Sequence, residues 1–308
     1  MPVKPLLARI VWGRYLDRPD QERKILEGLI RQTPRALGRW GEVQFTIEPV
    51  ESCDFLLIAD LPNRDLTVTV PPENVWSFTI EPPNEYFWRY HLAQPGIART
   101  YTSSPEFHGK ELINIPVPIN WHIGLSFDEL EQQPFPDKKK PVSCITSTLQ
   151  AFAGQRERFE FTKKLMQAGI ADVYGRGIAE IPRKWDAIAP YGSVVVVENF
   201  RNSLYWSEKI ADVFLGYAMP IYYGCTGILD YFPEGSIITI DITGDDVIDR
   251  LREIISQRPW TQSLEAIRCA REKVLYEYNF FSYFEQQISE TVSRPARLVT
   301  IPSFKYSL

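Results

Sequence analysis

The chain has 308 residues, of which 44% are hydrophobic, so it holds enough apolar material for two domain cores. Its net charge of −5 at pH 7 argues against a nucleic-acid-binding protein, because such proteins usually carry a basic surplus. No apolar stretch reaches about 18 residues, which argues against a transmembrane helix and favours a cytoplasmic protein that associates with membranes at most peripherally.

The first half alternates short apolar runs with polar turns. Residues 20–32 place Ile25, Leu29 and Ile30 on one face and predict a surface helix. Six runs of apolar or alternating residues predict strands, at 6–12, 43–47, 54–59, 66–70, 75–80 and 96–101. This half is therefore expected to form an α/β domain.

Residues 116–141 break this pattern and predict an interdomain linker. They contain five prolines and the charged run Asp137-Lys138-Lys139-Lys140. We expect a solvated hinge here, although the three lysines are also a candidate phosphate patch. The predicted organisation is an N-terminal domain at residues 1–135, a C-terminal domain at 136–290 and an irregular tail at 291–308.

The second half continues with alternating elements. Residues 142–146, 172–174 and 237–242 predict strands, and residues 155–168 predict a helix with Phe159, Leu165 and Met166 facing inward. Three further helices are predicted at 245–257, 261–276 and 279–291, the last of them rich in aromatic residues.

Within this half, residues 194–224 predict a strand, a helix and a second strand. The four valines at 194–197 are typical of a strand buried on both faces, and Ser207 is a suitable N-cap for the helix. Ligands of parallel α/β sheets bind beyond the carboxyl ends of the strands, where helix N-termini attract anions. We therefore expect a phosphate-bearing ligand near Lys209.

Two successive α/β halves predict two Rossmann-like domains facing across a cleft, an architecture shared by many nucleotide-sugar glycosyltransferases. The same periodicity fits a periplasmic-type binding protein or a two-domain dehydrogenase. A start without signal-peptide features weakens the first alternative, and the lack of a GxGxxG turn after an early strand weakens the second.

No cysteine or histidine spacing indicates a metal site. The four cysteines lie far apart without a CxxC pair, which is typical of a reduced cytosolic protein without structural zinc. Asp245 and Asp246 open a predicted helix, where acidic residues are favourable without any metal.

Several fragments of the second half occur in an order and spacing that identify a family. They are Val197-Glu198-Asn199, Tyr205-Trp206-Ser207-Glu208-Lys209, and the segments at 219–224 and 231–238. Together they resemble glycosyltransferase family 10, the α1,3/α1,4-fucosyltransferases, in a soluble bacterial-type form. Upstream, Arg158 fits a family arginine that lies seven residues before a helix leucine, with Arg156 as a competing choice. In the first half, Glu81 ends a strand as an acidic residue of the family does.

The resemblance implies a GT-B fold and an inverting transfer from a GDP-sugar, usually GDP-fucose, to a glycan hydroxyl without a bound metal or other cofactor. It implies that the N-terminal domain (1–135) lies on the acceptor side, that the C-terminal domain (136–290) binds the donor, and that Glu81 is the catalytic base. The implied donor-binding residues are Arg158 and Lys209 on the pyrophosphate, Glu208 on the ribose, Asn199 and Tyr205 on the ribose or diphosphate-sugar, and Glu198 on the sugar or a basic partner.

Plainer roles remain open for the same residues. Glu81 also suits a carboxylate that ends a strand and pairs with an arginine, and Lys209 also suits an ordinary salt bridge with a glutamate. A lysine in the first turn of a helix opposes the helix dipole, so we expect a compensating anion beside it. Phe200 and Ser207 depart from the family pattern, which leaves a different nucleotide-sugar donor, or a non-catalytic nucleotide-sugar or glycan-binding protein, as alternatives.

Overall fold

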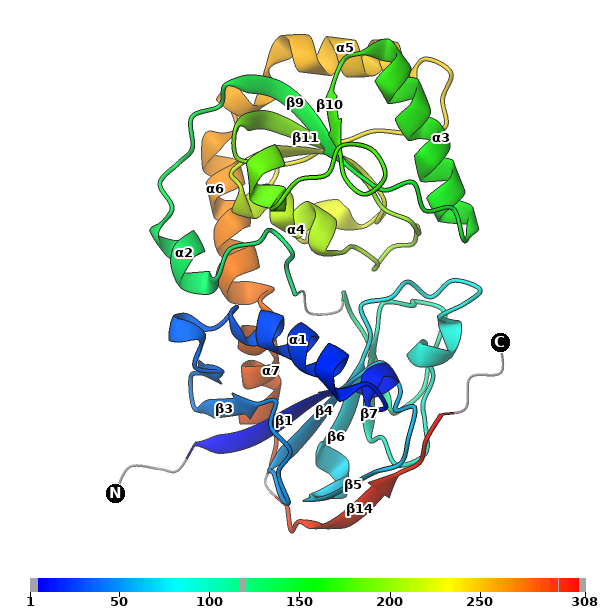
Figure 1. Ribbon diagram of the computed structural model, residues 1–308, viewed down its shortest axis with the longest axis vertical. Helices are drawn as coiled ribbons and strands as arrows, with labels where there is room; N and C mark the ends of the chain where they lie inside the picture. The colour runs from blue at the N-terminus through cyan, green and yellow to red at the C-terminus, as the bar shows by residue number, and fades with distance from the viewer. Residues whose placement is uncertain (1–4, 117–119, 293, 305–308) are drawn as a thin grey trace. The chain divides into compact units, whose positions relative to one another are not determined.

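The computed structural model describes residues 5–116, 120–292 and 294–304 (Figure 1). The chain divides into two units, and each has its own sheet. Unit 1 comprises Met1–Asn120, Ser126–Asp128 and Tyr278–Leu308, and unit 2 comprises Trp121–Leu125 and Glu129–Glu277. Of the predicted linker, residues 117–119 lie outside the described residues.

Unit 1 is built on a sheet whose strands run in the order β2-β3-β1-β4-β6-β7-β8. β2 pairs antiparallel with β3, whereas the pairs from β3 to β8 are parallel. The strands are β1 (Leu6–Trp12), β2 (Arg39–Trp40), β3 (Val43–Thr46), β4 (Phe55–Ala59), β6 (Val75–Phe78), β7 (Arg99–Thr102) and β8 (Leu112–Asn114). The apolar runs predicted in the first half form most of these strands.

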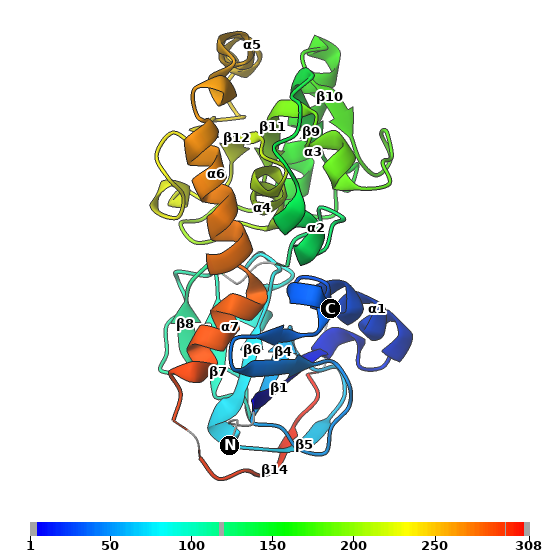
Figure 2. The ribbon, with the colours of Figure 1, turned by 90° about the vertical axis from the view of Figure 1, so that its left-hand side faces the viewer.

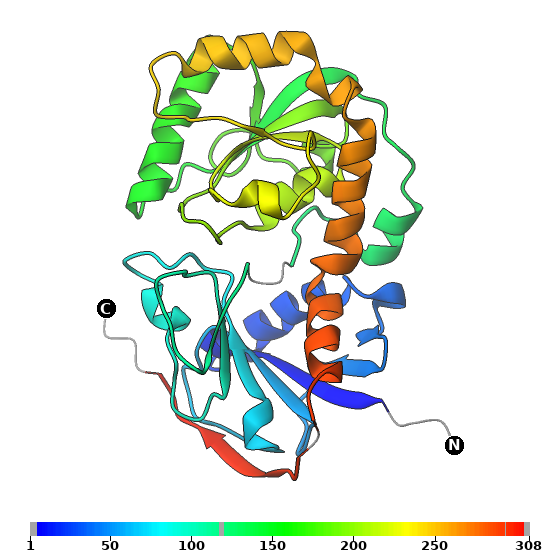
Figure 3. The ribbon, with the colours of Figure 1, turned by 180° about the vertical axis from the view of Figure 1, so that it is seen from behind.

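Alternate residues of the central strands pack into two separate cores. On one face, Ile10 of β1 packs with α1 (Pro19–Ile30) and α7 (Phe280–Ser289). On the other face, Val11 packs with β5 (Leu66–Val70), which pairs antiparallel with β14 (Arg297–Ile301). β14 is the red strand at the edge of unit 1 in Figure 3. Part of the segment predicted as an irregular tail is therefore a strand of this unit.

Helix α7 belongs to unit 1, although we predicted residues 279–290 as part of the C-terminal domain. Figure 2 shows it lying against the first sheet. Its aromatic rings meet those of three strands: Phe281 lies 5.0 Å from Phe45, Phe280 lies 5.0 Å from Phe78, and Phe284 lies 5.2 Å from Tyr101, measured between ring centroids. The apolar face of the helix is thus buried on the sheet of unit 1.

Because Phe284 is fully buried in this core, Phe284→Ala is expected to lower the free energy of unfolding of unit 1 by about 3–5 kcal/mol. Urea unfolding followed by circular dichroism measures the change. Gln286→Ala on the exposed side of the same helix is the matched control and should change the stability little. Equal effects of the two variants would contradict the packing of α7 described above.

Unit 2 is built on a parallel sheet in the order β10-β9-β11-β12-β13. Its strands are β9 (Lys140–Ile145), β10 (Asp172–Tyr174), β11 (Tyr191–Val197), β12 (Met219–Tyr223) and β13 (Ile238–Thr239). Its longer helices are α3 (Ala153–Ala168), α4 (Glu208–Leu215), α5 (Val247–Gln257) and α6 (Leu264–Glu272). From β9 the chain goes to β10 on one side and then to β11 on the other, so the strand order reverses between β9 and β11.

The predicted linker is more structured than a solvated hinge. It contains the short helix α2 (Phe127–Gln132). The Lys138 ammonium donates hydrogen bonds to the carbonyl oxygens of Ala189 (2.9 Å) and Gly216 (2.8 Å), and burial lowers its pKa to about 7. Lys138 therefore ties the segment to unit 2, while Lys139 is exposed as expected. Of the helices in the described parts of the chain, none is long and apolar enough to cross a bilayer.

Candidate functional site

A cavity of about 150 Å³ lies in unit 2 where the strand order reverses. It is lined by the residues that end β9, by the valines of β11 and by the first turns of α4. The polar side chains in its wall are Thr146, Ser147, Arg158, Lys184, Glu208, Lys209 and Asp212. This is the place in an open parallel sheet where ligands characteristically bind.

Helix α4 begins at this cavity because Ser207 caps it, as the sequence predicts. The Ser207 hydroxyl accepts from the backbone N–H of Lys209 (3.4 Å) and contacts both carboxylate oxygens of Glu198 at 2.8 Å. Glu198 also accepts from the Ser207 backbone N–H (3.0 Å). A buried carboxylate thus lies at the positive end of the α4 dipole, which is a favourable place for it.

The same glutamate is the anion expected beside Lys209. The Lys209 ammonium lies 3.1 Å from Oε2 of Glu198, donates to the Ser207 hydroxyl (3.0 Å) and lies 3.6 Å from Oε1 of Glu208. Burial acts against its charge, but the two glutamates outweigh this and raise its pKa, so Lys209 is a cation. The salt bridge that we considered as an alternative role is present, and it holds the ammonium in the wall of the cavity.

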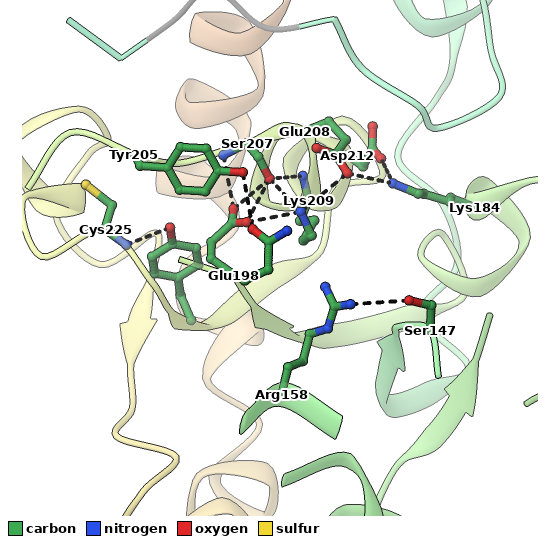
Figure 4. A network of polar contacts seen from close by, with 12 residues as sticks. Ser147, Arg158, Lys184, Glu198, Tyr205, Ser207, Glu208, Lys209, Asp212 and Cys225 are labelled. Atoms are coloured by element: carbon green, nitrogen blue, oxygen red, sulfur yellow. Dashed lines mark hydrogen bonds and ion pairs between the residues drawn. The ribbon is translucent and has the colours of Figure 1, made fainter. Parts of the chain in front are cut away.

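A second lysine, Lys184, approaches Glu208 from the opposite side (Figure 4). Its ammonium lies 3.6 Å from Oε1 of Glu208 and 2.7 Å from Oδ2 of Asp212. Burial would raise the pKa of Glu208, but Lys209 and Lys184 outweigh it and lower that pKa, so Glu208 is ionised. The other oxygen of Asp212 accepts from the backbone N–H of His122 (2.8 Å).

Arg158 is the cation of this cavity that lacks a carboxylate partner among the described residues. It is 7% exposed and donates from Nη2 to the Ser147 hydroxyl (3.2 Å), while its Nε has no hydrogen-bond partner in the described structure. Burial lowers its pKa. The hydroxyl of Thr146, also in the cavity wall, has no partner in the described part of the chain either. Both the Arg158 guanidinium and the Thr146 hydroxyl can donate hydrogen bonds to an oxyanion.

The competing choice, Arg156, points elsewhere. Its Nη1 donates to the backbone carbonyls of Gln150 (3.3 Å) and Ala151 (3.1 Å), and its side chain is exposed. The structure therefore places Arg158, and not Arg156, in the cavity wall.

Asn199 and Tyr205 lie beside the cavity without lining it. The Tyr205 hydroxyl donates to Oδ1 of Asn199 (3.3 Å). The Asn199 carbonyl oxygen packs so closely on α3 that a Cβ at Gly154 would lie 1.9 Å from it. Glu198 likewise stands behind the wall, where it contacts Ser207 and Lys209. Of the six predicted donor-binding residues, the structure thus brings Arg158, Glu208 and Lys209 to one cavity.

The predicted base Glu81 belongs to unit 1, shortly after the end of β6. Its Oε1 accepts from Nη2 of Arg14 (2.7 Å), and its side chain is 24% exposed. This is the pairing with an arginine that we considered as its alternative role. The carboxylate nevertheless remains partly accessible.

The sequence reasoning missed Lys184 and Asp212. Asp212 follows Glu208 by one helical turn, so the i, i+4 spacing places the two acids on one face of α4 and was a usable signal. Lys184 lies in the short 3₁₀ segment Lys184–Ala187, and no local pattern marks it. In the described ranges, no group of three or more His, Cys, Asp or Glu side chains could hold a metal ion.

Comparisons with known proteins were made by sequence and by structure. No family model and no curated protein matches the chain. A solved α1,3-fucosyltransferase has 14% identity and a TM-score of 0.50, over 100% of this chain and 95% of its own. A structure of α1,3-fucosyltransferase with GDP-fucose has 16% identity and a TM-score of 0.51, over 94% of this chain and 92% of its own.

An α-glucosyltransferase in complex with UDP and a 13-mer DNA has 11% identity and a TM-score of 0.52, over 92% of this chain and 99% of its own. At these identities the likeness concerns the fold alone. The predicted α/β fold of the GT-B type is confirmed: this chain folds as the GT-B glycosyltransferases do.

Proposed function

We propose that the protein is an inverting glycosyltransferase that moves fucose from GDP-fucose to a hydroxyl group of a glycan acceptor, without a bound metal ion. The observation that carries this proposal is Arg158, a buried cation with an unpartnered Nε in a cavity at the carboxyl ends of parallel strands. A diphosphate supplies the acceptor oxygens that such a group requires.

Two further observations support the donor. The family fragments at 197–199 and 205–209 lie at the end of β11 and the start of α4, and both elements contribute residues to the cavity wall. The chain also has the fold of an α1,3-fucosyltransferase that was solved with GDP-fucose. Unit 2 is thus the proposed donor-binding domain, and unit 1 the proposed acceptor-side domain.

In the proposed reaction, the negative charge that develops on the leaving diphosphate is stabilised by the protein itself. Arg158 and Lys209 contact the phosphates, with Lys184 as a third cation in the same wall. Such groups, fixed before the reaction, are a main source of transition-state stabilisation.

Because these cationic side chains are proposed to take the place of a divalent cation, excess EDTA is expected to leave the rate of transfer unchanged.

Glu81 is the proposed base. It removes the proton from the acceptor hydroxyl as the oxygen attacks the anomeric carbon on the face opposite the diphosphate, which inverts the configuration. Glu208 is proposed to accept hydrogen bonds from the ribose. Asn199, Tyr205 and Glu198 are proposed to support the site from behind, Glu198 by fixing Lys209 and Ser207.

A second donor and acceptor class follows from the α-glucosyltransferase, which has the same fold and was solved with UDP and DNA. A UDP-sugar donor and a nucleic-acid acceptor are therefore included in the test, since the net charge alone argues against the latter. A non-catalytic nucleotide-sugar or glycan-binding protein is the third outcome.

Thermal-shift titration with GDP, GDP-fucose, GDP-mannose and UDP-glucose tests the donor. We expect GDP and GDP-fucose to raise the melting temperature most, because a ligand that binds only the folded state stabilises it, by about 2.7 kcal/mol at one hundred times its Kd. Lys209→Met should weaken this shift, whereas Lys139→Met, in an exposed lysine outside the cavity, should leave it unchanged. A preference for UDP-glucose would replace the proposed donor.

Turnover is measured as release of GDP with a panel of oligosaccharide acceptors and with double-stranded DNA. NMR of the product is expected to show an anomeric configuration opposite to that of the donor. Binding of GDP-fucose without release of GDP, either to these acceptors or to water, would favour the non-catalytic alternative.

A further inference from the structure

The candidate base Glu81 is held by two other side chains of unit 1. Arg14 follows β1, and Asp60 is the residue directly after β4. In this sheet the chain passes from β1 to β3 on one side and then to β4 on the other, so the strand order reverses between β1 and β4. Arg14 and Asp60 therefore lie at the position in unit 1 where open α/β sheets bind their ligands.

Asp60 is fixed firmly at this position. It is 1% exposed and has a φ of 60°, a left-handed conformation that is uncommon in residues other than glycine. Its Oδ2 accepts from Nε1 of Trp12 (3.1 Å), and its Oδ1 accepts from the hydroxyl of Thr79 (2.7 Å). Backbone strain of this kind persists where the surroundings determine the conformation, and such places are often functional sites.

Arg14 connects this buried carboxylate to Glu81. Its Nε forms an ion pair with Oδ2 of Asp60 at 3.0 Å, and its Nη2 donates to Oε1 of Glu81 at 2.7 Å. Burial acts against the charge of the guanidinium, but Asp60 and Glu81 outweigh it and raise the pKa of Arg14. Arg14 is thus a permanent cation that pairs with the carboxylates of Asp60 and Glu81.

Only one of the two carboxylate oxygens of Glu81 contacts Arg14. Oε1 accepts from Arg14, while Oε2 has no hydrogen-bond partner among the described residues, and the side chain is 24% exposed. Its backbone is fixed at both ends: the N–H donates to the Thr79 hydroxyl (3.1 Å), and the carbonyl oxygen contacts Nε2 of His91 (3.0 Å). One oxygen is held, and the other is open.

Among the described residues, few charged groups face Glu81. Arg14 contacts it from the turn after β1, and Asp60 stands behind Arg14 at the end of β4. His91, from the 3₁₀ helix η4 (Trp88–His91), is fully buried, and burial lowers its pKa to about 4, so its ring is neutral above that pH. The nearest charge that acts on the Glu81 carboxylate is therefore the guanidinium of Arg14.

We propose that Arg14, anchored by Asp60, is a positioning residue that holds Oε1 of Glu81 in place and leaves Oε2 free to accept the proton. This inference rests on the proposed transferase function. In the step, Oε2 takes the proton of the attacking hydroxyl, whose oxygen forms a bond with the anomeric carbon. The bond from that carbon to the diphosphate breaks, and its electron pair leaves with the phosphate.

The test uses the complete protein, with GDP-fucose and UDP-glucose as donors and water as the acceptor. Release of the nucleoside diphosphate is followed as a function of donor concentration for the wild type and for Arg14→Ala. A base that is displaced by about 1 Å can slow the chemical step by about 100-fold. Arg14→Ala should therefore lower kcat by at least about tenfold, while the KM for the donor stays unchanged because Arg14 belongs to unit 1.

Three comparisons separate positioning from a general structural role. Added guanidinium ion at millimolar concentration should restore part of the rate of Arg14→Ala, whereas urea, which is neutral and of similar shape, should not. Asp60→Asn, which leaves Arg14 in place, should lower kcat by less. Arg23→Ala is the matched control, because Arg23 makes an equally short 2.7 Å contact with Glu48 but on the exposed surface, and it should leave kcat unchanged.

The outcomes distinguish this inference from the function on which it rests. If the wild type releases diphosphate from neither donor, the proposed function fails and the inference fails with it. If the wild type is active, Glu81→Gln is inactive, and Arg14→Ala either keeps the wild-type kcat or loses it without guanidinium rescue, only the positioning role is overturned. If Arg14→Ala does not fold, Asp60→Asn and Arg14→Lys supply the same comparison, and a wild-type kcat for both overturns the inference.

Discussion

Glu81→Gln is expected to lower sugar transfer by about 10²–10⁴-fold, which is the usual contribution of a general base. The amide has nearly the same shape as the carboxylate but does not take up the proton of the attacking hydroxyl. Because Glu81 belongs to unit 1 and the proposed diphosphate site to unit 2, the Kd for GDP should stay unchanged. Initial rates with GDP-fucose, together with GDP titration by calorimetry, measure both quantities.

Glu85→Gln is the matched control for this experiment. Glu85 is an exposed carboxylate four residues further along the same loop, so its variant should keep the wild-type rate. A rate for Glu81→Gln within a few-fold of the wild type would remove Glu81 as the base. Its contact with Arg14 would then be an ordinary ion pair at the end of a strand.

The sequence predicts the positions of the helices and strands better than it predicts which of the two sheets a helix packs against. The valines at 194–197 indicate a strand buried on both faces, and β11 has this property. The aromatic helix α7 was also predictable, but nothing in its pattern says which of two sheets its rings cover. That choice depends on the shape of the opposing surface, here the rings of Phe45, Phe78 and Tyr101, which local periodicity does not contain.

Helix α3 shows the same limit on a smaller scale. We expected Phe159, Leu165 and Met166 to face inward, but Met166 is 49% exposed and Phe159 is half-buried. The buried face is instead formed by Gln155, Arg158, Phe161, Thr162 and Leu165. A polar residue on the inner face of a helix is hidden from a search for apolar residues, and here it is the arginine that lines the cavity.

The residues of the candidate site were predictable where they are adjacent in the sequence. Ser207, Glu208 and Lys209 are consecutive, so one resemblance locates all three at the start of α4. Asp212 follows Glu208 by one helical turn, so its spacing also marked it. Lys184 joins them only through the tertiary fold, because it lies in the separate 3₁₀ segment Lys184–Ala187. Likewise, Arg14, Asp60 and Glu81 follow three different strands, and only the strand order brings them together.

Arg158→Met is expected to weaken the binding of GDP without lowering the stability of the protein. In the protein without ligand, Arg158 is a buried cation that donates a hydrogen bond of 3.2 Å to Ser147, and its Nε is unsatisfied in the described structure. Replacing a buried, poorly compensated charge by an apolar side chain of similar length is often neutral or stabilising. We therefore expect an unchanged or higher melting temperature without ligand.

In contrast, the Kd for GDP should rise about 10–100-fold, because a hydrogen bond to a charged group contributes about 1.5–3 kcal/mol. Arg156→Met is the matched control: this arginine lies two residues earlier on the same helix, is exposed and contacts only backbone carbonyls in the described structure, so its variant should bind GDP normally. A large loss of stability in Arg158→Met with intact GDP binding would assign Arg158 to the core. Weaker GDP binding with unchanged stability would instead assign Arg158 to binding of the diphosphate.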